Sequence, residues 1–331
     1  MCKKIIIGIA LGDQAGIASE VVAKALLKMA PLTFIPVLVG NEKLFRENCC
    51  AELPLRKLSD DFKREDLYDG IWLYDIEAGP DIETGRISGD SGCLMYDSLV
   101  KTLELEKAGL VDAVIMAPIT KQALHEAGLM YTAEFDIFKE AYNVKACRAV
   151  VTCEHIFRST VVGHVAFRDI PEKLTEEGII STAEGLYEVV KKFNPGKDCT
   201  LAVAALNPHA GENGLFGDEE ERVISPAIRA LSARGIRASG PWPADTVFLR
   251  ALQGKDDGVV FMYHDQGNIA MKSRFFGEGV LIYTGIPAII TSVGHGSALD
   301  IAGKGIADEA NMVSAVMYAL ELAEKRKEKT K

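Results

Sequence analysis

The chain has 331 residues, of which 48% are hydrophobic and 25% charged, so it is long enough to bury one large core or two linked ones. Its formal net charge of −10 argues against nucleic acid or an anionic membrane as a partner, because both need a basic surface. Seven cysteines occur without metal-type spacing, and the adjacent Cys49 and Cys50 cannot readily bridge each other. No stretch reaches the roughly 18 apolar residues that a membrane span needs. The composition therefore predicts a cytoplasmic protein with reduced thiols.

Short apolar runs alternate with longer segments of helical period along the chain. In chain order, the predicted elements are strand 4–11, helix 19–29, strand 34–39, helix 92–107, strands 113–116 and 148–152, helix 172–192, strand 200–205, helix 219–233, strands 258–262 and 288–292, and helix 311–325. Continuous apolar strands separated by amphipathic helices are typical of a mostly parallel sheet covered by helices. The stretch 155–162, HIFRSTVV, reads as an extra strand that breaks the alternation. We therefore expect an α/β fold whose sheet is mixed in the middle third.

Three histidines lie in loop-like breaks between these elements: His164 in VVGHVAFRD, His209 in LNPHAGENG and His264 in MYHDQGN. His209 and His264 each follow an apolar, strand-like run, and strand ends are where an α/β protein presents its chemistry. Three neutral imidazoles with an open fourth position are a standard way to hold a catalytic divalent metal. Three unrelated, hydrogen-bonded histidines fit the spacing equally well, so both interpretations stay open at this point.

Two glycine-containing loops follow strands in the predicted fold. LGDQAGIASE precedes a helix whose free backbone N–H groups could receive an anion, with a plain structural turn as the alternative. It is not G-x-G-x-x-G, so the ordinary dinucleotide fingerprint is missing. The second loop, SVGHGSALDIAGKGIAD at residues 292–308, has glycines that would let the backbone wrap closely around a flat ligand. His295 offers a ring for stacking, and Asp300 and Asp308 could accept hydrogen bonds from ribose hydroxyls.

These strings carry a resemblance to known families. GHGSALDIAGKGIAD resembles the adenosine-binding loop of the isopropylmalate and isocitrate dehydrogenases. The wider set GDQAGIASE, MAPITKQALHEAG, LNPHAGENGLFGDEE, GPWPADTVF, MYHDQG and TSVGHGSALDIAG resembles the 4-hydroxythreonine-4-phosphate dehydrogenase family of vitamin B6 synthesis, in order and over nearly the whole chain. The resemblance implies an α/β fold of the isocitrate/isopropylmalate dehydrogenase type, with two α/β domains flanking a cleft. It implies a cofactor-side domain at 1–130 and 275–331, and a metal, substrate and dimerisation domain at 131–274.

The resemblance also implies a metal site and a coenzyme site. A divalent metal at the interface of a homodimer would be held by His164, His209 and His264. An all-histidine set suits zinc, cobalt, nickel or manganese better than magnesium, which prefers oxygen ligands. NAD would be bound by the glycine-rich loop and preferred over NADP, because the loop offers carboxylates and no arginine for a 2′-phosphate. The expected NAD-binding residues are His295, Gly296, Ser297, Ala298, Asp300 and Asp308.

The catalytic groups follow from the same resemblance. It implies an aspartate pair near the substrate, Asp245 in PADT and Asp265 in HDQG, and a substrate lysine, Lys272. Lys272, or a carboxylate such as Asp245, would take the hydroxyl proton, while the metal acts as Lewis acid. The expected reaction is oxidation by NAD of a secondary alcohol β to a carboxylate, with decarboxylation.

Several positions of the expected substrate pocket depart from the family pattern. Where the family carries G-H-T-E, the chain reads AEFD, with Glu134 and Phe135 at the central positions. Leu281 occupies a family asparagine position, Ile290 a phosphate-binding arginine position, and Gly294 the aspartate position before H-G. Losing the arginine removes up to two charge-assisted bonds to a phosphate, and Glu134 would add repulsion. We therefore expect an unphosphorylated hydroxy acid, as in the terephthalate dihydrodiol dehydrogenase branch, which the string SVGHGSA resembles.

Other functions fit the same residues. The chain could act on 4-hydroxythreonine-4-phosphate, or on a 4-phospho-threonate or -erythronate, in pyridoxal phosphate synthesis or sugar-acid catabolism, if Arg168, Lys272 or Arg274 has taken over the phosphate. A metal-dependent lyase of the aldolase type also uses three histidines but has no use for the 292–308 loop. A catalytically inactive metabolite-binding protein would be expected to lose its metal ligands first, and all three are present.

Overall fold

The computed structural model describes residues 4–131, 133–154, 156–275 and 277–329. The chain forms two compact units, one from Met1–Cys147 together with Ile286–Lys331 and the other from Arg148–Gly285. The unit boundaries therefore lie at 147/148 and 285/286, whereas the sequence placed the domain boundaries at 130/131 and 274/275. The functional roles assigned to the two domains stay predictions.

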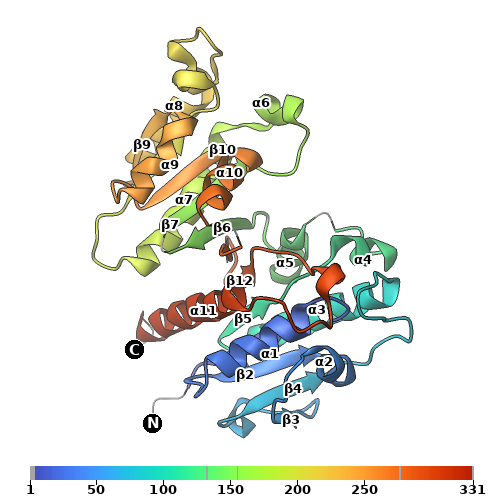
Figure 1. The fold of residues 1–331 in the computed structure, drawn as a ribbon. Helices are drawn as coiled ribbons and strands as arrows, with labels where there is room; N and C mark the ends of the chain where they lie inside the picture. The colour runs from blue at the N-terminus through green and yellow to red at the C-terminus, as the bar shows by residue number, and fades with distance from the viewer. Residues whose placement is uncertain (1–3, 132, 155, 276, 330–331) are drawn as a thin grey trace. The chain divides into compact units, whose positions relative to one another are not determined.

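The first unit is built on a parallel sheet with the strand order β3-β4-β2-β1-β5-β12 (Figure 1). Its strands are β1 (Ile6–Ala10), β2 (Ile35–Gly40), β3 (Leu55–Lys57), β4 (Ile71–Asp75), β5 (Ala113–Met116) and β12 (Ile290–Val293). Its α-helices are α1 (Ala18–Lys28), α2 (Glu42–Asn48), α3 (Gly89–Lys107), α4 (Lys121–Glu126), α5 (Glu134–Tyr142) and α11 (Ala310–Lys329). Helix α3 contacts β1, β2 and β5, while α1 and α11 pack together. Every residue of β1, β2, β5 and β12 is buried, as expected for parallel strands covered on both faces.

The second unit has a mixed sheet with the strand order β11-β6-β7-β10-β8-β9. Its strands are β6 (Arg148–Cys153), β7 (Ile156–Val162), β8 (Thr200–Ala204), β9 (Arg237–Trp242), β10 (Gly258–Tyr263) and β11 (Val280–Thr284). β6 is antiparallel to both β11 and β7, and the remaining pairings are parallel. This confirms the mixed sheet predicted from HIFRSTVV, although His155, the first residue of that string, lies outside the described residues.

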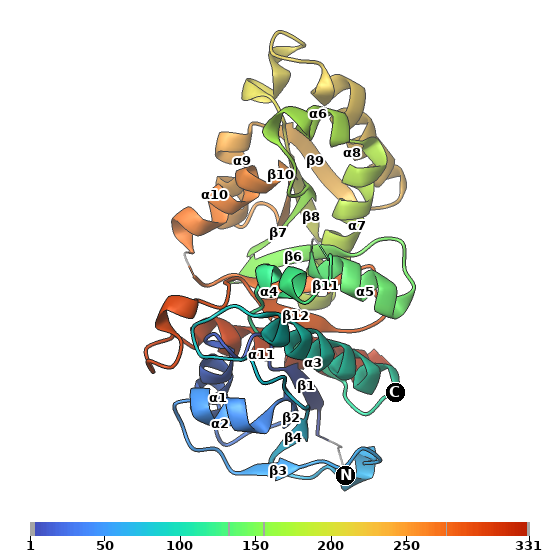
Figure 2. The ribbon, with the colours of Figure 1, turned by 90° about the vertical axis from the view of Figure 1, so that its right-hand side faces the viewer.

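Helices cover both faces of the second sheet. They are α6 (Ile170–Lys173), α7 (Glu176–Phe193), α8 (Ser225–Ala233), α9 (Ala244–Leu252) and α10 (His264–Arg274), with a π-helix at Glu220–Ile224 before α8. Figure 2 shows α9 and α10 on one face and α7 and α8 on the other. None of the described helices is long and apolar enough to cross a membrane.

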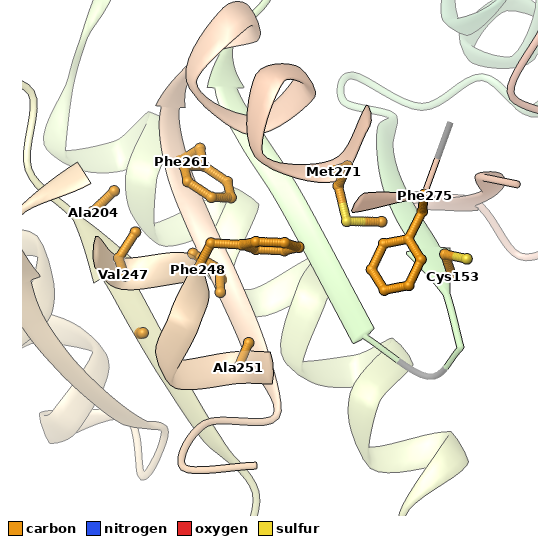
Figure 3. Packing of buried hydrophobic residues seen from close by; sticks show 10 residues of the cluster. Cys153, Ala204, Val247, Phe248, Ala251, Phe261, Met271 and Phe275 are labelled. Carbon is orange, nitrogen blue, oxygen red and sulfur yellow. The ribbon is translucent and has the colours of Figure 1, made fainter. Parts of the chain in front are cut away.

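A buried cluster joins α9 and α10 to the strands beneath them (Figure 3). Phe261 of β10 is fully buried and lies among Phe248 of α9 and Met271 of α10. Helix α10 also approaches the sheet closely at Gly267, where a Cβ would lie 3.1 Å from the Phe261 ring and 3.1 Å from Thr160 Oγ1. This packing fixes the position of α10, whose first residue is His264.

Three element predictions need correction. The single helix expected at 172–192 is interrupted at Leu174, and α7 starts anew because the Thr175 side chain accepts a hydrogen bond from Gly178 N–H. The helix expected at 219–233 begins as a π-helix before continuing as α8. The loop-like break expected around His264 is instead the start of α10. The first residues of this helix, HDQGN, are polar and show no apolar periodicity, so the sequence pattern did not predict it.

Candidate metal and coenzyme sites

The second unit presents its candidate metal ligands at the carboxyl ends of adjacent parallel strands. His164 lies two residues beyond β7, His264 directly follows β10, and His209 follows β8. Asp245 lies in the first turn of α9, after β9. The register pairs Tyr263 with Val162, so the ends of β10 and β7 are level. This carboxyl edge is where parallel α/β sheets bind their ligands.

His164 and His264 lie next to each other. Their ring centroids are 4.7 Å apart and the ring planes are inclined by 46°. His264 Nδ1 is 2.7 Å from Asp265 Oδ1, and its Nε2 is 2.7 Å from Asn268 Nδ2. Both nitrogens of this ring therefore have defined partners.

The tautomer of His264 follows from a buried arginine. Arg158 is 6% exposed, and its Nη2 donates a hydrogen bond to Asn268 Oδ1. A guanidinium has only donors, so the Asn268 carbonyl faces Arg158 and its amide N–H faces His264. Nε2 of His264 is then the acceptor, and Nδ1 carries the proton that Asp265 accepts. A carboxylate on one ring nitrogen is the usual support for a histidine whose other nitrogen binds a metal.

Burial makes Arg158 an unusual cation. Loss of solvent lowers the pKa of Arg158 to about 10. Its Nη1 donates to Thr160 Oγ1 at 3.0 Å, while its Nε has no hydrogen-bond partner among the described residues. A buried charge is costly unless it is hydrogen-bonded, and the bonds to Thr160 and Asn268 offset part of that cost.

His209 is exposed, and its described contacts are with Glu212 and Phe216. Its Nδ1 is 3.4 Å from Glu212 Oε2, and its ring meets Phe216 edge-on at 6.1 Å between centroids. Among the described residues, no three His, Cys, Asp or Glu side chains form a group that could hold a metal ion. One copy of the chain thus brings two of the three predicted ligands together.

The predicted catalytic side chains are exposed. Asp265 contacts His264, as described above, whereas Asp245 stands on α9 and Lys272 on α10. Lys272 directly follows the buried Met271, so the packing of α10 sets its position along the helix.

The first unit gathers polar groups at the ends of β1, β5 and β12, which are adjacent. Thr120 Oγ1 donates to Asp13 Oδ2 and lies 2.7 Å from Ser297 Oγ, while Asp13 Oδ1 accepts from Ala15 N–H at 3.1 Å. Asp13 is only 1% exposed, and this burial raises its pKa although hydrogen bonds from Thr120, Ser297 and Ala15 act in the opposite direction. The cluster ties the loop after β1 to the loop after β12.

The backbone N–H groups just before α1 have partners inside the protein. The N–H groups of Ala15 and Gly16 donate to Asp13, and that of Ile17 donates to Ser297 O at 2.9 Å. A Cβ at Gly16 would collide with the Ser297 carbonyl oxygen. The loop after β1 therefore braces the 292–308 loop, and the anion site expected at the N–H groups of α1 itself stays a prediction.

The 292–308 loop offers groups that suit a nucleotide. His295 Nδ1 lies 3.0 Å from Gly296 O, whereas its Nε2 is buried and has no hydrogen-bond partner among the described residues. An unpartnered buried nitrogen is a natural contact for a ligand. The Asp300 side chain is exposed. Asp308 has a structural role, because its Oδ1 accepts the N–H of the first residue of α11 at 2.8 Å.

Helix α1 holds the far end of the same loop. Lys24 Nζ donates to Gly305 O and Ala307 O, each at 2.9 Å, and pairs with Glu20 Oε1 at 2.7 Å. Glu20 Oε1 also accepts Ala307 N–H at 2.8 Å. The backbone of residues 305–307 is thus fixed to one face of α1.

The altered pocket positions have surroundings that residue type alone does not reveal. Glu134 Oε2 lies 3.8 Å from Lys121 Nζ, so its charge is partly compensated. Ile290 is fully buried in β12, where it pairs with Val114. Phe135 on α5 is partly buried. Leu281, also partly buried, pairs with Val151 across β11 and β6.

Comparisons with known proteins identify the class as a dehydrogenase that acts on a CH–OH group. The family model described as pyridoxal phosphate biosynthetic protein PdxA matches residues 33–319, and the chain belongs to that family. It is 36% identical over 326 residues to the D-threonate 4-phosphate dehydrogenase of Salmonella typhimurium, covering 96% of this chain and 98% of the relative. It is similar in structure to 4-hydroxythreonine-4-phosphate dehydrogenase from Klebsiella pneumoniae, with a TM-score of 0.84, 31% identity, and 97% and 98% of the two chains covered. The family resemblance drawn from the sequence is confirmed.

The expectation of an unphosphorylated hydroxy acid, oxidised with decarboxylation, is wrong. The terephthalate 1,2-cis-dihydrodiol dehydrogenase structure from Burkholderia xenovorans is less similar, with a TM-score of 0.66, 25% identity, and 96% and 98% of the two chains covered. Relatives named for phosphorylated substrates match better. The prediction judged residue types without their neighbours: Lys121 lies beside Glu134, and the buried Ile290 was counted as pocket surface.

Sequence reasoning missed the residues that support the histidines and the loop. Arg158 is a charge inside an apolar strand string, FRSTVV, which is the kind of signal that marks a buried functional ion. Asn268 lies one helical turn after His264 and would have been found if α10 had been predicted. No sequence signal joins Thr120 to Asp13, because only the sheet brings the ends of β5 and β1 together.

Proposed function

We propose that the chain is an NAD- and divalent-metal-dependent dehydrogenase that oxidises the secondary alcohol of a phosphorylated hydroxy acid of the D-threonate 4-phosphate class. The observation that carries the proposal is the 36% identity to D-threonate 4-phosphate dehydrogenase, which extends over 96% of this chain and 98% of the relative. The similar fold of a 4-hydroxythreonine-4-phosphate dehydrogenase makes that amino acid phosphate the second candidate substrate. A role in pyridoxal phosphate synthesis would follow from the second substrate.

We infer that the metal is held by His164 and His264 of one protomer and by His209 of a second copy in a homodimer. The contact between His164 and His264 supports this site, and no group of three ligand side chains forms among the described residues of one copy. With its proton on Nδ1, His264 would bind the metal through Nε2, and the metal would take the place of the Asn268 N–H that Nε2 accepts in this structure. Zinc, cobalt, nickel or manganese suits these donors. Such a metal, when bound, supplies a Lewis acid for the oxygen that becomes a carbonyl.

Lys272 and Asp245 are the two groups proposed to accept the hydroxyl proton. Both are exposed on helices that follow strands at the same carboxyl edge of the second unit. Asp265 is proposed to orient His264 through the 2.7 Å contact with Nδ1, and not to touch the proton that is transferred.

NAD is proposed to bind the 292–308 loop through His295, Gly296, Ser297, Ala298, Asp300 and Asp308. The unpartnered Nε2 of His295 and the fixation of the loop by Asp13 and Lys24 support this site. An exposed carboxylate at Asp300 would repel the 2′-phosphate of NADP, so NAD is the proposed coenzyme.

The remaining assignments stay predictions. Glu134, Phe135 and Leu281 are proposed to face the substrate. Ile290 is buried and is proposed to act only through the packing of β12, the strand to which it belongs. Arg168, Lys272 or Arg274 is proposed to receive the phosphate. An arrangement of the isocitrate/isopropylmalate dehydrogenase type, with two domains flanking a cleft, and a cytoplasmic location are likewise proposed.

The test is NADH formation from D-threonate 4-phosphate and from 4-hydroxythreonine-4-phosphate by the metal-loaded chain. We expect turnover that is lost when EDTA removes the metal and restored when cobalt or zinc is added back. Absence of NADH with both phosphorylated compounds, in protein shown to contain metal, would contradict the proposal.

A further inference from the structure

The loop that carries His209 has an uncommon backbone. Residues His209, Ala210, Gly211, Glu212 and Asn213 all have positive φ, with values of 53°, 57°, 76°, 43° and 57°. Such left-handed conformations are unfavourable for residues other than glycine. A run of them persists only where the surrounding structure holds it, and such strain is concentrated at functional sites.

One buried carboxylate holds the start of this loop. Glu220 is 4% exposed, and its Oε1 accepts the backbone N–H groups of Leu206 at 2.9 Å and Asn207 at 2.8 Å. Its Oε2 accepts Asn207 Nδ2 at 2.9 Å. These are charge-assisted hydrogen bonds, which satisfy a carboxylate that would otherwise be costly to bury.

The loop is also built to pass close to this carboxylate. A Cβ at Gly211 would lie only 2.7 Å from Glu220 Oε2, so glycine is required for the approach. Glu220 opens the π-helix 220–224, a local widening that is frequent at functional sites. The Glu220 carboxylate thus binds the first residues of the loop, Leu206 and Asn207, and also lies close to Gly211 in its middle.

Apolar packing does not hold the loop in the same way. Its large apolar residues, Leu215 and Phe216, are 70% and 46% exposed. The backbone that leads into His209 is therefore restrained by the hydrogen bonds of Glu220, together with one from Asn207 Nδ2 to Glu219 Oε2 at 2.7 Å.

We propose that Glu220 is a positioning residue for His209 as a metal ligand: its buried carboxylate keeps the strained left-handed loop in the conformation that presents the imidazole. This inference rests on the proposed function, because the metal role of His209 is proposed there. Glu220 does not touch the metal; it acts through the backbone of Leu206 and Asn207 and through the path of Gly211.

The first test is cobalt binding by the full-length chain, measured by titration and by the ligand-field spectrum of bound Co²⁺. In Glu220→Gln, an amide N–H₂ replaces one acceptor oxygen and cannot accept the bonds that oxygen made. We expect Co²⁺ affinity to fall about 10- to 100-fold, as for other residues that support metal ligands, with an altered spectrum. The matched control is Glu221→Gln, the same charge change at an exposed neighbour, which should bind Co²⁺ within about twofold of the unmodified chain.

The second test changes the strain without touching Glu220. Ala210→Gly should restore part of the lost affinity when combined with Glu220→Gln, because glycine adopts this backbone without penalty. Ala210→Val in the otherwise unmodified chain should weaken Co²⁺ binding, because a β-branched residue is an outlier at positive φ. This variant keeps the proposal testable if Glu220→Gln fails to fold.

The outcomes separate the two levels of inference. If the unmodified chain binds Co²⁺ while Glu220→Gln, or Ala210→Val in its place, binds within about twofold of it, the role of Glu220 is wrong and the proposed function stands. If the unmodified chain binds no Co²⁺, the proposed function is wrong, and the role given to Glu220 falls with it.

Discussion

Both ring nitrogens of His264 have hydrogen-bond partners, Asp265 and Asn268, and Asn268 is in turn bound by the buried Arg158. Arg158, buried in β7, sets the orientation of the Asn268 amide, which in turn sets the tautomer of His264. Asp265 accepts the remaining ring proton. Metal binding at Nε2 would displace the Asn268 N–H, whereas the contact between Nδ1 and Asp265 can stay and keep the ring oriented.

Removing a histidine should therefore remove the metal and leave the fold. We expect His164→Ala, His209→Ala and His264→Ala each to lower metal affinity by more than about 100-fold, beyond the usual effect of supporting residues. His125→Ala is the matched control, because that ring is exposed and has a hydrogen bond with a backbone carbonyl, Tyr131 O at 3.0 Å. Elemental analysis of purified variants is the measurement, with circular dichroism to check folding. Full metal content in any of the three variants would remove that residue from the site.

Asp13 should make stability depend on pH. Burial raises its native pKa above the ordinary value of 3.8, so the folded chain binds this proton more tightly than the unfolded chain does. The stability contributed by Asp13 is therefore present at low pH and is lost as pH rises from 3.8 through the native pKa. Asp13→Asn mimics the protonated side chain, so its melting temperature relative to the unmodified chain should increase over that interval. Calorimetry across pH tests this, with Asp300→Asn as the exposed control; a difference that does not vary with pH would refute it.

Helix α1 holds the proposed coenzyme loop through Lys24, whose ammonium group donates hydrogen bonds to the backbone of residues 305 and 307. Lys24→Met keeps the apolar stem and removes the donors, so the loop should loosen. We expect KM for NAD to rise about tenfold, the equivalent of one charge-assisted hydrogen bond, with metal affinity unchanged. Lys28→Met is the control one turn later, since Lys28 pairs with Glu309 at 2.8 Å and not with the loop backbone. An unchanged KM for NAD would show that the loop does not depend on α1.

Helix α10 carries His264, Asn268 and Lys272, and its buried anchor is Met271. Met271→Ala removes a side chain that is 3% exposed and leaves a cavity in the buried cluster, beside Phe275 (Figure 3). We expect the free energy of unfolding to fall by about 2–5 kcal/mol. Ile269→Ala, 70% exposed on the same helix, should change it by less than about 0.5 kcal/mol. Equal losses in the two variants, measured by urea denaturation, would mean that α10 is not anchored as described.

The strands were the most predictable part of the fold, because parallel strands covered by helices are continuous apolar runs. The run 113–116 coincides with β5, and the run 258–262 falls one residue short of β10. Short edge strand β3, with Arg56 and Lys57 exposed, has no such run. The buried residues of α10 are Gly267 and Met271, so its sequence has no apolar stripe that would predict a helix.

The candidate site was predictable to the extent that a residue type carries its own chemistry. Three histidines after strands could be singled out, and two of them meet. The phosphate question could not be settled in that way, because residue types alone do not reveal neighbours such as Lys121 beside Glu134, which lie on different helices. The support of His264 by Arg158 crosses 106 residues of sequence and needs both β7 and α10 to be known.

At the scale of the whole molecule, each unit offers one half of the proposed chemistry at the carboxyl ends of its parallel strands. The first holds a braced loop suited to NAD, and the second holds the histidines and the groups proposed to move a proton. The central claim is that these parts serve a phosphorylated hydroxy acid.

The most direct test is the ratio of kcat/KM for D-threonate 4-phosphate to that for D-threonate, measured by NADH absorbance with the same metal-loaded protein. The account predicts that the phosphate ester is preferred by at least about a hundredfold, because two charge-assisted hydrogen bonds to the phosphate are each worth about 1.5–3 kcal/mol. Equal values for the two acids, or a preference for the unphosphorylated one, would contradict it.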